Sequence, residues 1–402
     1  MSGTDYLDEL DAIASIVTGR PAMLDTSTRT AFDDSHGQFR ETVRKLFDRA
    51  LIPNLDRYEQ EGVVDRDFWR ACGDAGLLCP TVPEALGGLG LDFSYNAVID
   101  EELGYVGSSA GITLQSDIVA GYIVNYGSPE QQAKWLPLMV SGEAITAIAM
   151  TEPGTGSDLQ GIKTTARRDG NHYVVNGSKT YITNGQSADV IIVVAKTDPS
   201  LGAKGMSLIL VEADREGFAR GRNLDKIGQH SADTSELFFS DVRVPITNCL
   251  GEEGKGFAYL MSQLPQERLS IAVSAQAGAQ RAFDEAVGFT KSRKAFGQTV
   301  FDFQNTRFAL ASLKTKLQVG WAHLDWAIKR HLAGELTATE GAAAKLWHTE
   351  LQWECCDVAL QLHGGAGYMN EYPIARLWRD ARVTRIFGGT SEIMREIVGR
   401  SV

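Results

Sequence analysis

The chain has 402 residues, 43% of them hydrophobic, and carries 39 Lys or Arg against 51 Asp or Glu, a formal net charge of −12. This composition can bury a substantial core and excludes a disordered or low-complexity chain. The net negative charge argues against a general nucleic-acid binder, because such proteins use a basic surface to displace counterions from phosphate. The length excludes a solitary small binding module and predicts two or three domains.

The charge is distributed unevenly along the chain. Residues 254–402 hold 18 Lys or Arg and 14 Asp or Glu, so this part stands at +4 and the preceding part at −16. A partner that carries phosphates would therefore meet the C-terminal part, where Arg376, Arg379, Arg382 and Arg385 recur. A solvated helix face explains these four arginines equally well, and both interpretations stay open.

Cysteine and histidine usage points to a reducing compartment and to no metal site. The five Cys form no C-x-x-C pair, and the seven His show no metal-ligand spacing. We expect no membrane span, because the longest apolar run, 190–195, is far shorter than a bilayer requires. The first residues, MSGTDYLDELDAIASIV, lack the basic region of a secretory signal, so a cytoplasmic location is the simplest prediction.

The first part of the chain is predicted to be helical. Residues 1–36 are polar and are interpreted as a loosely attached N-terminal extension. Over 37–145, apolar residues recur at helical spacing and predict helices at 38–57, 68–75 and 95–106. Ser128 followed by Pro129 is typical of a helix start, with Ser as the N-cap and Pro as the first helical residue.

The hydrophobic period changes near residue 145 and again near 253. Short segments rich in β-formers, at 173–175, 179–183, 190–195, 206–211 and 237–244, predict a middle β domain over 146–252. Long helical patterns at 257–291, 302–333, 336–363 and 371–400 predict a four-helix bundle over 253–402. The expected fold class is α+β, in three domains of α, β and α type.

A turn-rich segment, AMTEPGTGSD at 149–158, begins the β domain. The hydroxyls of Thr151, Thr155 and Ser157, with main-chain N–H groups that the glycines leave uncovered, suit a polar ring edge or a phosphate. Taken alone, the segment is better explained as a surface loop. The following KTYITNG at 179–185 is by itself only a hairpin signal.

Five motifs in fixed order change this interpretation. They are TEPGTGSD at 151–158, NGSKTYITNG at 176–185, RKAFG at 293–297, QLHGGAGY at 361–368 and IFGGTSEI at 386–393. Each is weak alone, but together they resemble the acyl-CoA dehydrogenase family over about residues 37–400. The long-chain and isovaleryl-CoA members are the most similar.

The resemblance implies an FAD enzyme with an N-terminal helical domain, a middle β domain and a C-terminal four-helix bundle, assembled as a homotetramer that is a dimer of dimers. The flavin would lie between the β domain and the bundle, with Arg293 and Gln304 supplied by the neighbouring subunit. The cofactor contacts that the resemblance implies are Met150, Thr151, Ser157, Tyr181, Thr183, Arg293, Phe296, Gln304, Gln361, Gly364, Gly365, Thr390 and Glu392.

The catalytic base is the point at which this chain departs from many members of the family. Those members carry a Glu where this chain has Gly388, and a glycine cannot act as a base. Other members place the Glu on the first helix of the C-terminal domain, and LPQERL at 264–269 matches that segment, so Glu267 is the candidate. A solvated surface Glu is the competing interpretation. The helical neighbours that would desolvate Glu267 and raise its pKa are Leu264, Ser270, Ile271 and Ser274.

Gly388 keeps a second role that the resemblance implies. Its main-chain N–H would hold the thioester oxygen and stabilise the charge that develops as the α-proton leaves, so Gly388 counts as catalytic with Glu267. The missing side chain is also expected to enlarge the cavity and to admit longer or branched acyl chains. Ser157, Arg268, Gly388 and Gly389 are the predicted substrate contacts.

The resulting expectation is an FAD-dependent acyl-CoA dehydrogenase of fatty-acid β-oxidation. It would convert a fatty or branched acyl-CoA into the trans-2-enoyl-CoA, with hydride transfer to flavin N5 and an electron-transfer flavoprotein as acceptor. Two alternatives stay open: an acyl-CoA oxidase or flavin monooxygenase relative that reacts with O2, and a non-catalytic member of the same fold.

Overall fold

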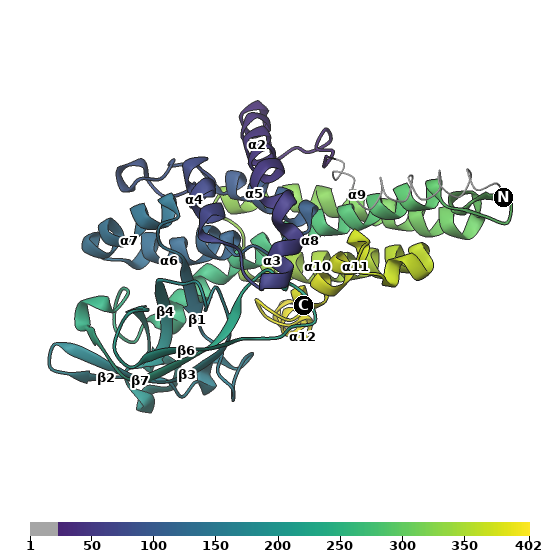
Figure 1. Cartoon of the computed structure of the whole chain (residues 1–402). Helices are drawn as coiled ribbons and strands as arrows, with labels where there is room; N and C mark the ends of the chain where they lie inside the picture. The colour runs from purple at the N-terminus through teal and green to yellow at the C-terminus, as the bar shows by residue number, and fades with distance from the viewer. Residues whose placement is uncertain (1–22) are drawn as a thin grey trace.

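The computed structural model describes residues 23–402, and the acidic N-terminal stretch on which the predicted compartment rests lies outside them. Figure 1 shows a group of short helices above a twisted sheet, with a bundle of long helices extending away from both. The α, β, α order and the α+β class are those predicted. No helix in the described part of the chain is both long and apolar enough to cross a membrane.

The N-terminal helices are α2 (Asp34–Leu46), α3 (Leu55–Glu61), α4 (Arg66–Asp74), α5 (Phe93–Val106), α6 (Ala120–Tyr126) and α7 (Pro129–Ser141). Helix α7 begins as predicted, because the Ser128 side chain accepts a hydrogen bond from the Gln131 N–H and Pro129 is the first helical residue. The predicted helical segment 38–57 is helical throughout but is not one regular α-helix. After α2 the chain forms a π-helical turn at Phe47–Leu51 and a 3-10 turn at Ile52–Asn54, where Pro53 has no N–H to continue the helix.

The middle strands are β1 (Thr146–Ala149), β2 (Thr165–Asp169), β3 (His172–Thr183), β4 (Val190–Lys196), β5 (Met206–Glu212), β6 (Phe218–Asn223) and β7 (Thr234–Pro245). They form one sheet in the order β1-β4-β2-β3-β7-β6, with β5 also paired to β4. β4 pairs parallel with β1 and β2, and the other pairings are antiparallel. The prediction missed β1, β2 and β6.

Strand β4 explains how the sheet joins two cores. Its alternate residues Val190, Ile192 and Val194 pack with the N-terminal helices, whereas Ile191 and Val193 pack with the interior of the β domain. A strand that is buried on both faces reads as a continuous apolar run, which is what the sequence shows at 190–195. The sheet is therefore fixed against the helices that carry one wall of the site.

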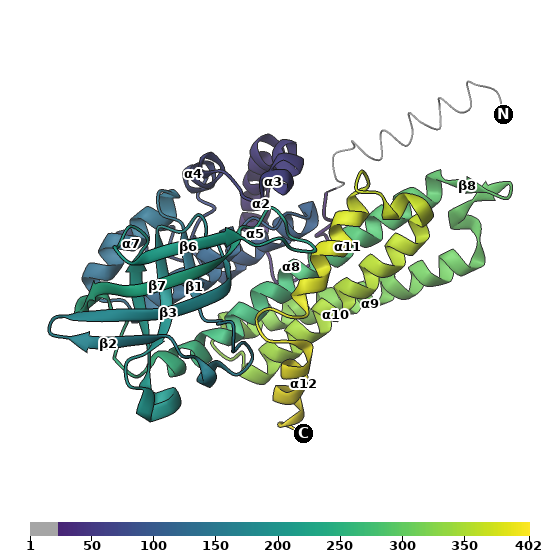
Figure 2. The ribbon, with the colours of Figure 1, turned by 60° about the horizontal axis from the view of Figure 1, so that its bottom comes forward.

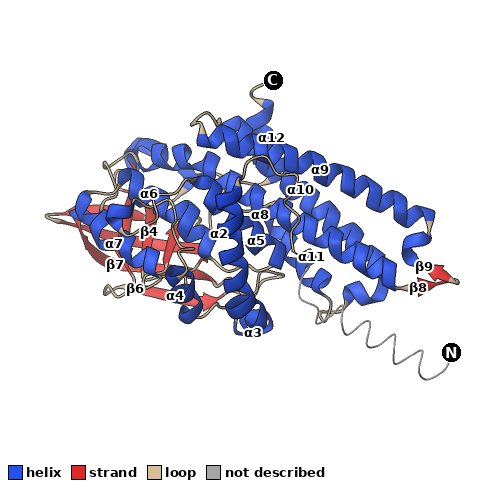
Figure 3. Ribbon diagram, turned by 90° about the horizontal axis from the view of Figure 1, so that it is seen from above, coloured by secondary structure: helices blue, strands red, loops and turns tan. Residues whose placement is uncertain are grey.

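The C-terminal elements are α8 (Gly256–Ser292), the short strands β8 (Lys294–Ala295) and β9 (Gln298–Thr299), α9 (Gln304–Leu332), α10 (Ala338–His363), α11 (Pro373–Thr384) and α12 (Ser391–Gly399). In Figure 3, α8, α9 and α10 run alongside one another away from the sheet toward the β8–β9 hairpin. The single helix predicted over 371–400 is wrong, because the chain turns between α11 and α12. Gly388 (φ 64°) and Gly389 (φ 100°) adopt backbone conformations that side chains disfavour.

The arginines of α11 and of the turn after it contact neighbouring helices, while a contact with a phosphate-bearing partner stays a prediction. Arg376 and Arg379 form ion pairs with Asp56 and Glu59 on helix α3, at 3.8 and 3.5 Å between nitrogen and oxygen. Nearby, Arg385 pairs with Glu350 and Arg382 lies over the ring of Trp353, both on α10. These cations attach α11 and the turn after it to neighbouring helices.

The segment before α2 is packed more tightly than the expected loose extension. Leu24 is buried, and the buried Arg29 donates from Nε to Asp325 Oδ1 on α9 at 2.6 Å. The same guanidinium donates to Glu101 on α5, whose other oxygen accepts a hydrogen bond from Arg40. Residues 24–33 therefore form a strap that joins the N-terminal domain to the bundle through buried charges.

We expect Arg29→Met to lower the free energy of unfolding by about 3 kcal/mol, because removal of one member of a buried ion pair leaves the other charge uncompensated. Chemical denaturation followed by circular dichroism measures the effect. The matched control is Arg243→Met, which removes a solvent-exposed pair with Asp169 and should cost less than about 1 kcal/mol. Equal losses in the two variants would show that the strap does not stabilise the fold.

Candidate functional site

Glu267 is buried in the middle of helix α8, with 5% of the residue exposed. The Tyr122 hydroxyl on helix α6 donates to Glu267 Oε1 at 2.7 Å. Burial raises the pKa of Glu267 to about 7, while the Tyr122 hydrogen bond and the positive charge of Arg268 oppose that rise. The solvated-surface interpretation is therefore wrong, and the carboxylate exchanges its proton near neutral pH, as a general base requires.

The turn that contains Gly388 lies one helical turn along α8 from Glu267. A side chain built on Gly388 would place its Cβ 2.4 Å from Cδ1 of Ile271, which is four residues after Glu267. Helical residues four apart share a face. The two positions that the resemblance implies for the carboxylate thus adjoin one site, and this chain has a carboxylate only at the one on α8.

The expected enlargement of the cavity at Gly388 is wrong in one respect. The space in which a side chain at Gly388 would begin is occupied by the end of Ile271, so the missing carboxylate leaves no void at that point. The left-handed backbone of Gly388 would add strain to any side chain there. The admission of longer or branched acyl chains stays a prediction.

Two buried cations hold the Gly388–Gly389 turn by its carbonyl groups. Lys345 on α10, which is fully buried, donates from Nζ to the Gly389 oxygen at 2.7 Å, and Arg268 Nε lies 3.4 Å from the Gly388 oxygen. Burial, with Arg268 as the next cause, lowers the pKa of Lys345 to about 8. The Gly388 N–H donates to no acceptor within residues 23–402, so it is available to a ligand. A contact between Arg268 and CoA stays a prediction.

A second group of buried carboxyls lies one turn from Glu267. Asp117, in the π-helical segment Leu114–Val119, accepts hydrogen bonds from Ser270 Oγ at 2.5 Å and from Asn96 Nδ2 at 2.7 Å. Asp100 on α5 accepts from Thr113 Oγ1 at 2.7 Å. Burial, and next the negative charge of Asp117, raises the pKa of Asp100 well above its usual range. Burial beside Asp117 therefore favours the protonated form of Asp100.

The loop after β1 is fixed by a buried ion pair between Lys179 and Glu152. Lys179 Nζ on β3 donates to the Met150 carbonyl oxygen and to Glu152 Oε1, both at 2.9 Å, and burial lowers its pKa to about 8. The Thr180 N–H donates to the Thr151 carbonyl at 2.9 Å. The segments 150–152 and 179–180, predicted to share a cofactor, therefore lie side by side.

Tyr181 presents an open aromatic ring beside this loop. An irregularity in the pairing of β3 with β7, between Lys179 and Ile182, coincides with a left-handed backbone at Tyr181 (φ 59°). Tyr181 is 70% exposed although it lies within a strand, and Thr183, two residues further along β3, is partly buried. An exposed aromatic surface next to hydroxyl and main-chain groups fits a flat polar ring.

Thr390 and Glu392 lie at the start of α12, where the Thr390 side chain accepts from the Ile393 N–H. Ser157 is exposed on the turn after β1.

The remaining predicted cofactor residues lie at the other end of the bundle. Arg293 ends α8, Phe296 belongs to the β8–β9 hairpin and Gln304 begins α9. Figure 2 shows this hairpin at the opposite end of the long helices from the sheet. Gln361, Gly364 and Gly365 are near that end as well, because the His363 ring between them stacks on Phe289 of α8 at 4.2 Å between centroids.

The predicted cofactor residues at the hairpin end of the bundle form an exposed surface that is suited to a ligand or to a second copy of the chain. Phe296 is 96% exposed, and the Arg293 guanidinium has no hydrogen-bond or ion-pair partner among residues 23–402. Side chains built on Gly364 and Gly365 would meet nothing within 4 Å. One copy of the chain therefore brings together the segments 150–152 and 179–180, and a free cation that suits a phosphate is presented elsewhere.

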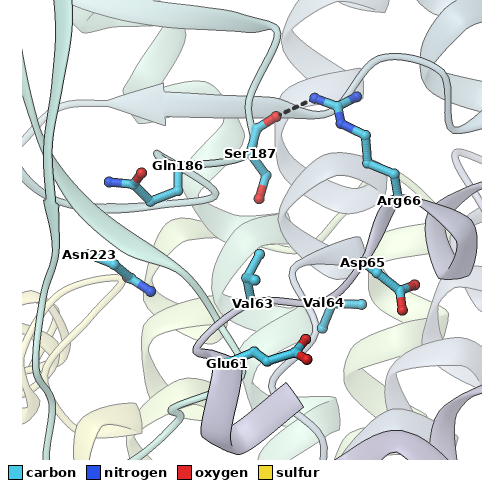
Figure 4. Close-up of a pocket in the computed structure, with 8 residues that line it drawn as sticks. All are labelled: Glu61, Val63, Val64, Asp65, Arg66, Gln186, Ser187 and Asn223. Atoms are coloured by element: carbon cyan, nitrogen blue, oxygen red, sulfur yellow. Dashed lines mark hydrogen bonds between the residues drawn. The ribbon is translucent and has the colours of Figure 1, made fainter. Parts of the chain in front are cut away.

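A separate cavity of about 450 Å³ lies between the N-terminal and β domains (Figure 4). Its one basic residue, Arg66, is already engaged, with Nη2 donating to the Ser187 carbonyl at 2.8 Å and pairing with Asp189. None of the residues predicted for the cofactor or substrate lines it. The lining residues are Glu61, Val63, Val64, Asp65, Arg66, Gln186, Ser187 and Asn223.

Three functional contacts could not be predicted from local patterns. Tyr122 is separated from Glu267 by 145 residues, and Lys345 is 44 residues from the carbonyl that it holds. Asp117 meets Ser270 across 153 residues. A charged residue in an otherwise apolar helical pattern indicates a buried polar contact but not its partner. Lys345 in GAAAKLW is such a residue.

Comparison with known proteins agrees with the geometry. The chain matches the acyl-CoA dehydrogenase N-terminal domain at residues 33–143, the middle domain at 147–242 and the C-terminal domain at 254–402. It is 47% identical to the long-chain specific acyl-CoA dehydrogenase of Sus scrofa, over 94% of this chain and 89% of that protein. It is 37% identical to isovaleryl-CoA dehydrogenase of Oryza sativa subsp. japonica, over 92% of each.

Solved structures show the same similarity. The acyl-CoA dehydrogenase from Geobacillus kaustophilus superposes with a TM-score of 0.92 at 49% identity, covering 93% of this chain and 99% of that one. A glutaryl-CoA dehydrogenase from Mycobacterium smegmatis, solved in complex with FADH2, superposes with a TM-score of 0.84 at 27% identity, covering 92% and 95%.

The raised pKa of Asp100 predicts a pH dependence of stability. Because its pKa is raised in the folded state, its stabilising contribution is complete below about pH 4 and is lost as pH rises through the folded-state pKa. Between the unfolded-state and folded-state pKa of Asp100, the free energy of unfolding of the wild type falls by up to about 1.4 kcal/mol per pH unit. We expect Asp100→Asn, which keeps a neutral group, to flatten this decline, measured as unfolding free energy from pH 4 to 9. The exposed control Asp214→Asn should retain the wild-type slope, and an unchanged slope in Asp100→Asn would contradict the assignment.

Proposed function

Because this chain belongs to the acyl-CoA dehydrogenase family, we propose that it oxidises a fatty or branched acyl-CoA to the trans-2-enoyl-CoA with Glu267 as the base. The family is FAD-dependent, and its members are oxidoreductases. The observation that carries the assignment of the base is the burial of Glu267, with a pKa of about 7, beside a Gly388 that has no side chain.

The residues present fit the flavin. Tyr181 offers an exposed ring beside Met150, Thr151 and Thr183, and Arg293 offers an unpaired cation for a pyrophosphate. Bound FAD supplies the acceptor, at N5, for the β-hydrogen that leaves as hydride. The chain itself would hold the flavin ring against the β domain.

Each protein group has a defined task in the proposed reaction. Glu267 takes the α-proton of the thioester, and its burial keeps the carboxylate basic enough to do so near neutral pH. The free Gly388 N–H donates to the thioester oxygen, which gains negative charge as the proton leaves. Lys345 and Arg268 keep that N–H in position by holding the carbonyls of the same turn.

The complete site requires a second copy of the chain. Arg293, Phe296 and Gln304 lie at the opposite end of the bundle from Tyr181, so one copy cannot surround a single flavin with both groups. Exposed apolar residues on α9 and α10, among them Phe308 and Trp347, are available for contacts between copies. We therefore propose a homotetramer, the assembly typical of the family.

The substrate class proposed from the relatives is a long-chain or a branched-chain acyl-CoA. A panel of palmitoyl-CoA, isovaleryl-CoA and butyryl-CoA, mixed anaerobically with the FAD-loaded enzyme, identifies the preferred chain from the rate of flavin bleaching. Failure of all three to bleach the flavin would contradict the proposed dehydrogenation.

We expect Glu267→Gln to slow flavin bleaching by the best of these substrates by at least about 100-fold, because general-base catalysis contributes roughly 10²–10⁴-fold. Stopped-flow absorbance of the flavin measures the rate. The control Glu396→Gln makes the same chemical change on an exposed part of α12 and should retain the wild-type rate. Unchanged bleaching in Glu267→Gln would remove the assignment of the base.

A second measurement separates a dehydrogenase from an oxidase. After reduction by the substrate, we expect the flavin to reoxidise slowly in air and rapidly when an electron-transfer flavoprotein is added, because reduced flavin needs a redox partner to turn over. The readouts are flavin absorbance and peroxide production. Rapid peroxide formation in the absence of the partner would favour the oxygen-reactive alternative.

A further inference from the structure

The hydroxyl of Tyr122 is the one protein hydrogen-bond donor to the Glu267 carboxylate among the described residues. It meets Oε1 at 2.7 Å, while Oε2 accepts from no residue in 23–402. Tyr122 is fully buried, and burial, followed by the neighbouring carboxylate, raises the pKa of its phenol well above its usual value. The phenol therefore remains a donor throughout the range in which Glu267 titrates.

The segment that carries Tyr122 is fixed against the same face of α8. Gln263, Gln266, Glu267 and Ser270 follow the i, i+3, i+4, i+7 spacing of one helical stripe. Each meets the segment 117–126, and the four contacts are Gln263 Nε2 to Tyr126 Oη at 3.3 Å, Gln266 Nε2 to the Asp117 carbonyl at 2.8 Å, Tyr122 Oη to Glu267 Oε1 at 2.7 Å and Ser270 Oγ to Asp117 Oδ2 at 2.5 Å.

Aromatic packing supports the same placement. The ring of Tyr126 stacks on Tyr259 of α8 at 3.9 Å between centroids, and Tyr122 lies one turn away on the same short helix. The backbone that carries Tyr122 is therefore held against α8 on both sides of the phenol. A hydrogen bond held in this way restrains the rotation of the carboxylate.

We propose that Tyr122 is the positioning residue of the base: its phenol holds Oε1 of Glu267 and thereby orients the unoccupied Oε2 toward the α-proton of the substrate. This inference rests on the proposed function, in which Glu267 is the base. Tyr122 does not itself receive the proton. The other charged group that acts on Glu267 is Arg268, from α8 itself.

The two oxygens of the carboxylate then have separate tasks. A hydrogen bond to Oε1 favours the ionised form, so Tyr122 limits the rise in pKa that burial causes. Loss of the hydroxyl removes both effects: the carboxylate turns more freely, and it stays protonated to a higher pH. A residue that only filled space would produce neither change.

Tyr122→Phe tests the proposal, because it removes the hydroxyl and keeps the ring. We expect the pH midpoint of the flavin-bleaching rate to rise by about one unit, from about 7, which leaves roughly fivefold less ionised carboxylate at pH 7, and the lost orientation of the carboxylate lowers the rate further. The rate should fall at least tenfold at pH 7 and recover in part at pH 9, whereas the dissociation constant for acyl-CoA should change less than about twofold. A midpoint and a rate equal to those of the wild type would overturn the proposal.

Tyr126→Phe is the matched control. It removes the Tyr126 hydroxyl, which lies on the same helix but contacts Gln263 and not Glu267. The midpoint of the pH profile of this variant should therefore equal that of the wild type. An equal shift in both variants would show that the effect comes from packing of the helix, and would also overturn the proposal.

A direct titration separates this proposal from the proposed function. Infrared spectroscopy follows the protonation of the Glu267 carboxyl, whose band is assigned by its loss in Glu267→Gln, without substrate turnover. A raised midpoint in Tyr122→Phe supports the hydrogen bond, and an unchanged midpoint overturns it even where Glu267→Gln is inactive. Full activity of Glu267→Gln would instead overturn the assignment of the base, and with it the role of Tyr122.

Discussion

The arrangement of this protein depends on the burial of one ionisable carboxylate, that of Glu267. An isolated charge in the interior is unfavourable unless hydrogen bonds or opposite charges compensate it. Here the compensation is partial, with one phenol donor and one neighbouring guanidinium, and the pKa settles at about 7. A fully compensated carboxylate would be too weak a base, and an uncompensated one would remain protonated.

The donor to this carboxylate comes from a different domain than the carboxylate itself. Tyr122 belongs to the N-terminal helices and Glu267 to the bundle, so the protonation of Glu267 depends on how the two domains dock. The docking is fixed by buried polar contacts, in which Asp117 meets Ser270, and Arg29 joins Glu101 to Asp325. Such contacts are favourable in one register only, because a shifted register would leave buried polar groups without partners.

The parts of the fold that the sequence predicts are those governed by periodicity within one element. Helix α8 was predicted at 257–291 and is found at Gly256–Ser292, because its apolar and small residues repeat over many turns. Strand β6 was missed, since this edge strand is polar or exposed at nearly every position and shows no alternation. The break between α11 and α12 was missed as well, because helical periodicity continues on both sides of Gly388 and Gly389.

The candidate site was predictable as a set of residues but not as a set of contacts. Order along the chain identified Glu267 and the glycine at 388, and the spacing on α8 predicted the direction in which the pKa of Glu267 would shift. It could not show that Ile271 fills the space next to Gly388, because that depends on side-chain packing between segments more than 100 residues apart. The hydrogen bond from Tyr122 to Glu267 could not be predicted for the same reason, because it joins residues that are 145 positions apart.

Local charge explains how a chain with a net charge of −12 can accept an anionic thioester. Lys345 and Arg268 are both buried beside the Gly388–Gly389 turn, and burial lowers the pKa of each. A lowered pKa means that the surroundings disfavour these cations, so any negative charge that develops nearby is stabilised by them. The enolate-like charge of the proposed reaction would develop at this place. The basic groups that stabilise this charge, Lys345 and Arg268, are therefore few and buried. The negative charges of the surface do not cancel their effect, because interactions of exposed charges are screened within about 10 Å at moderate salt.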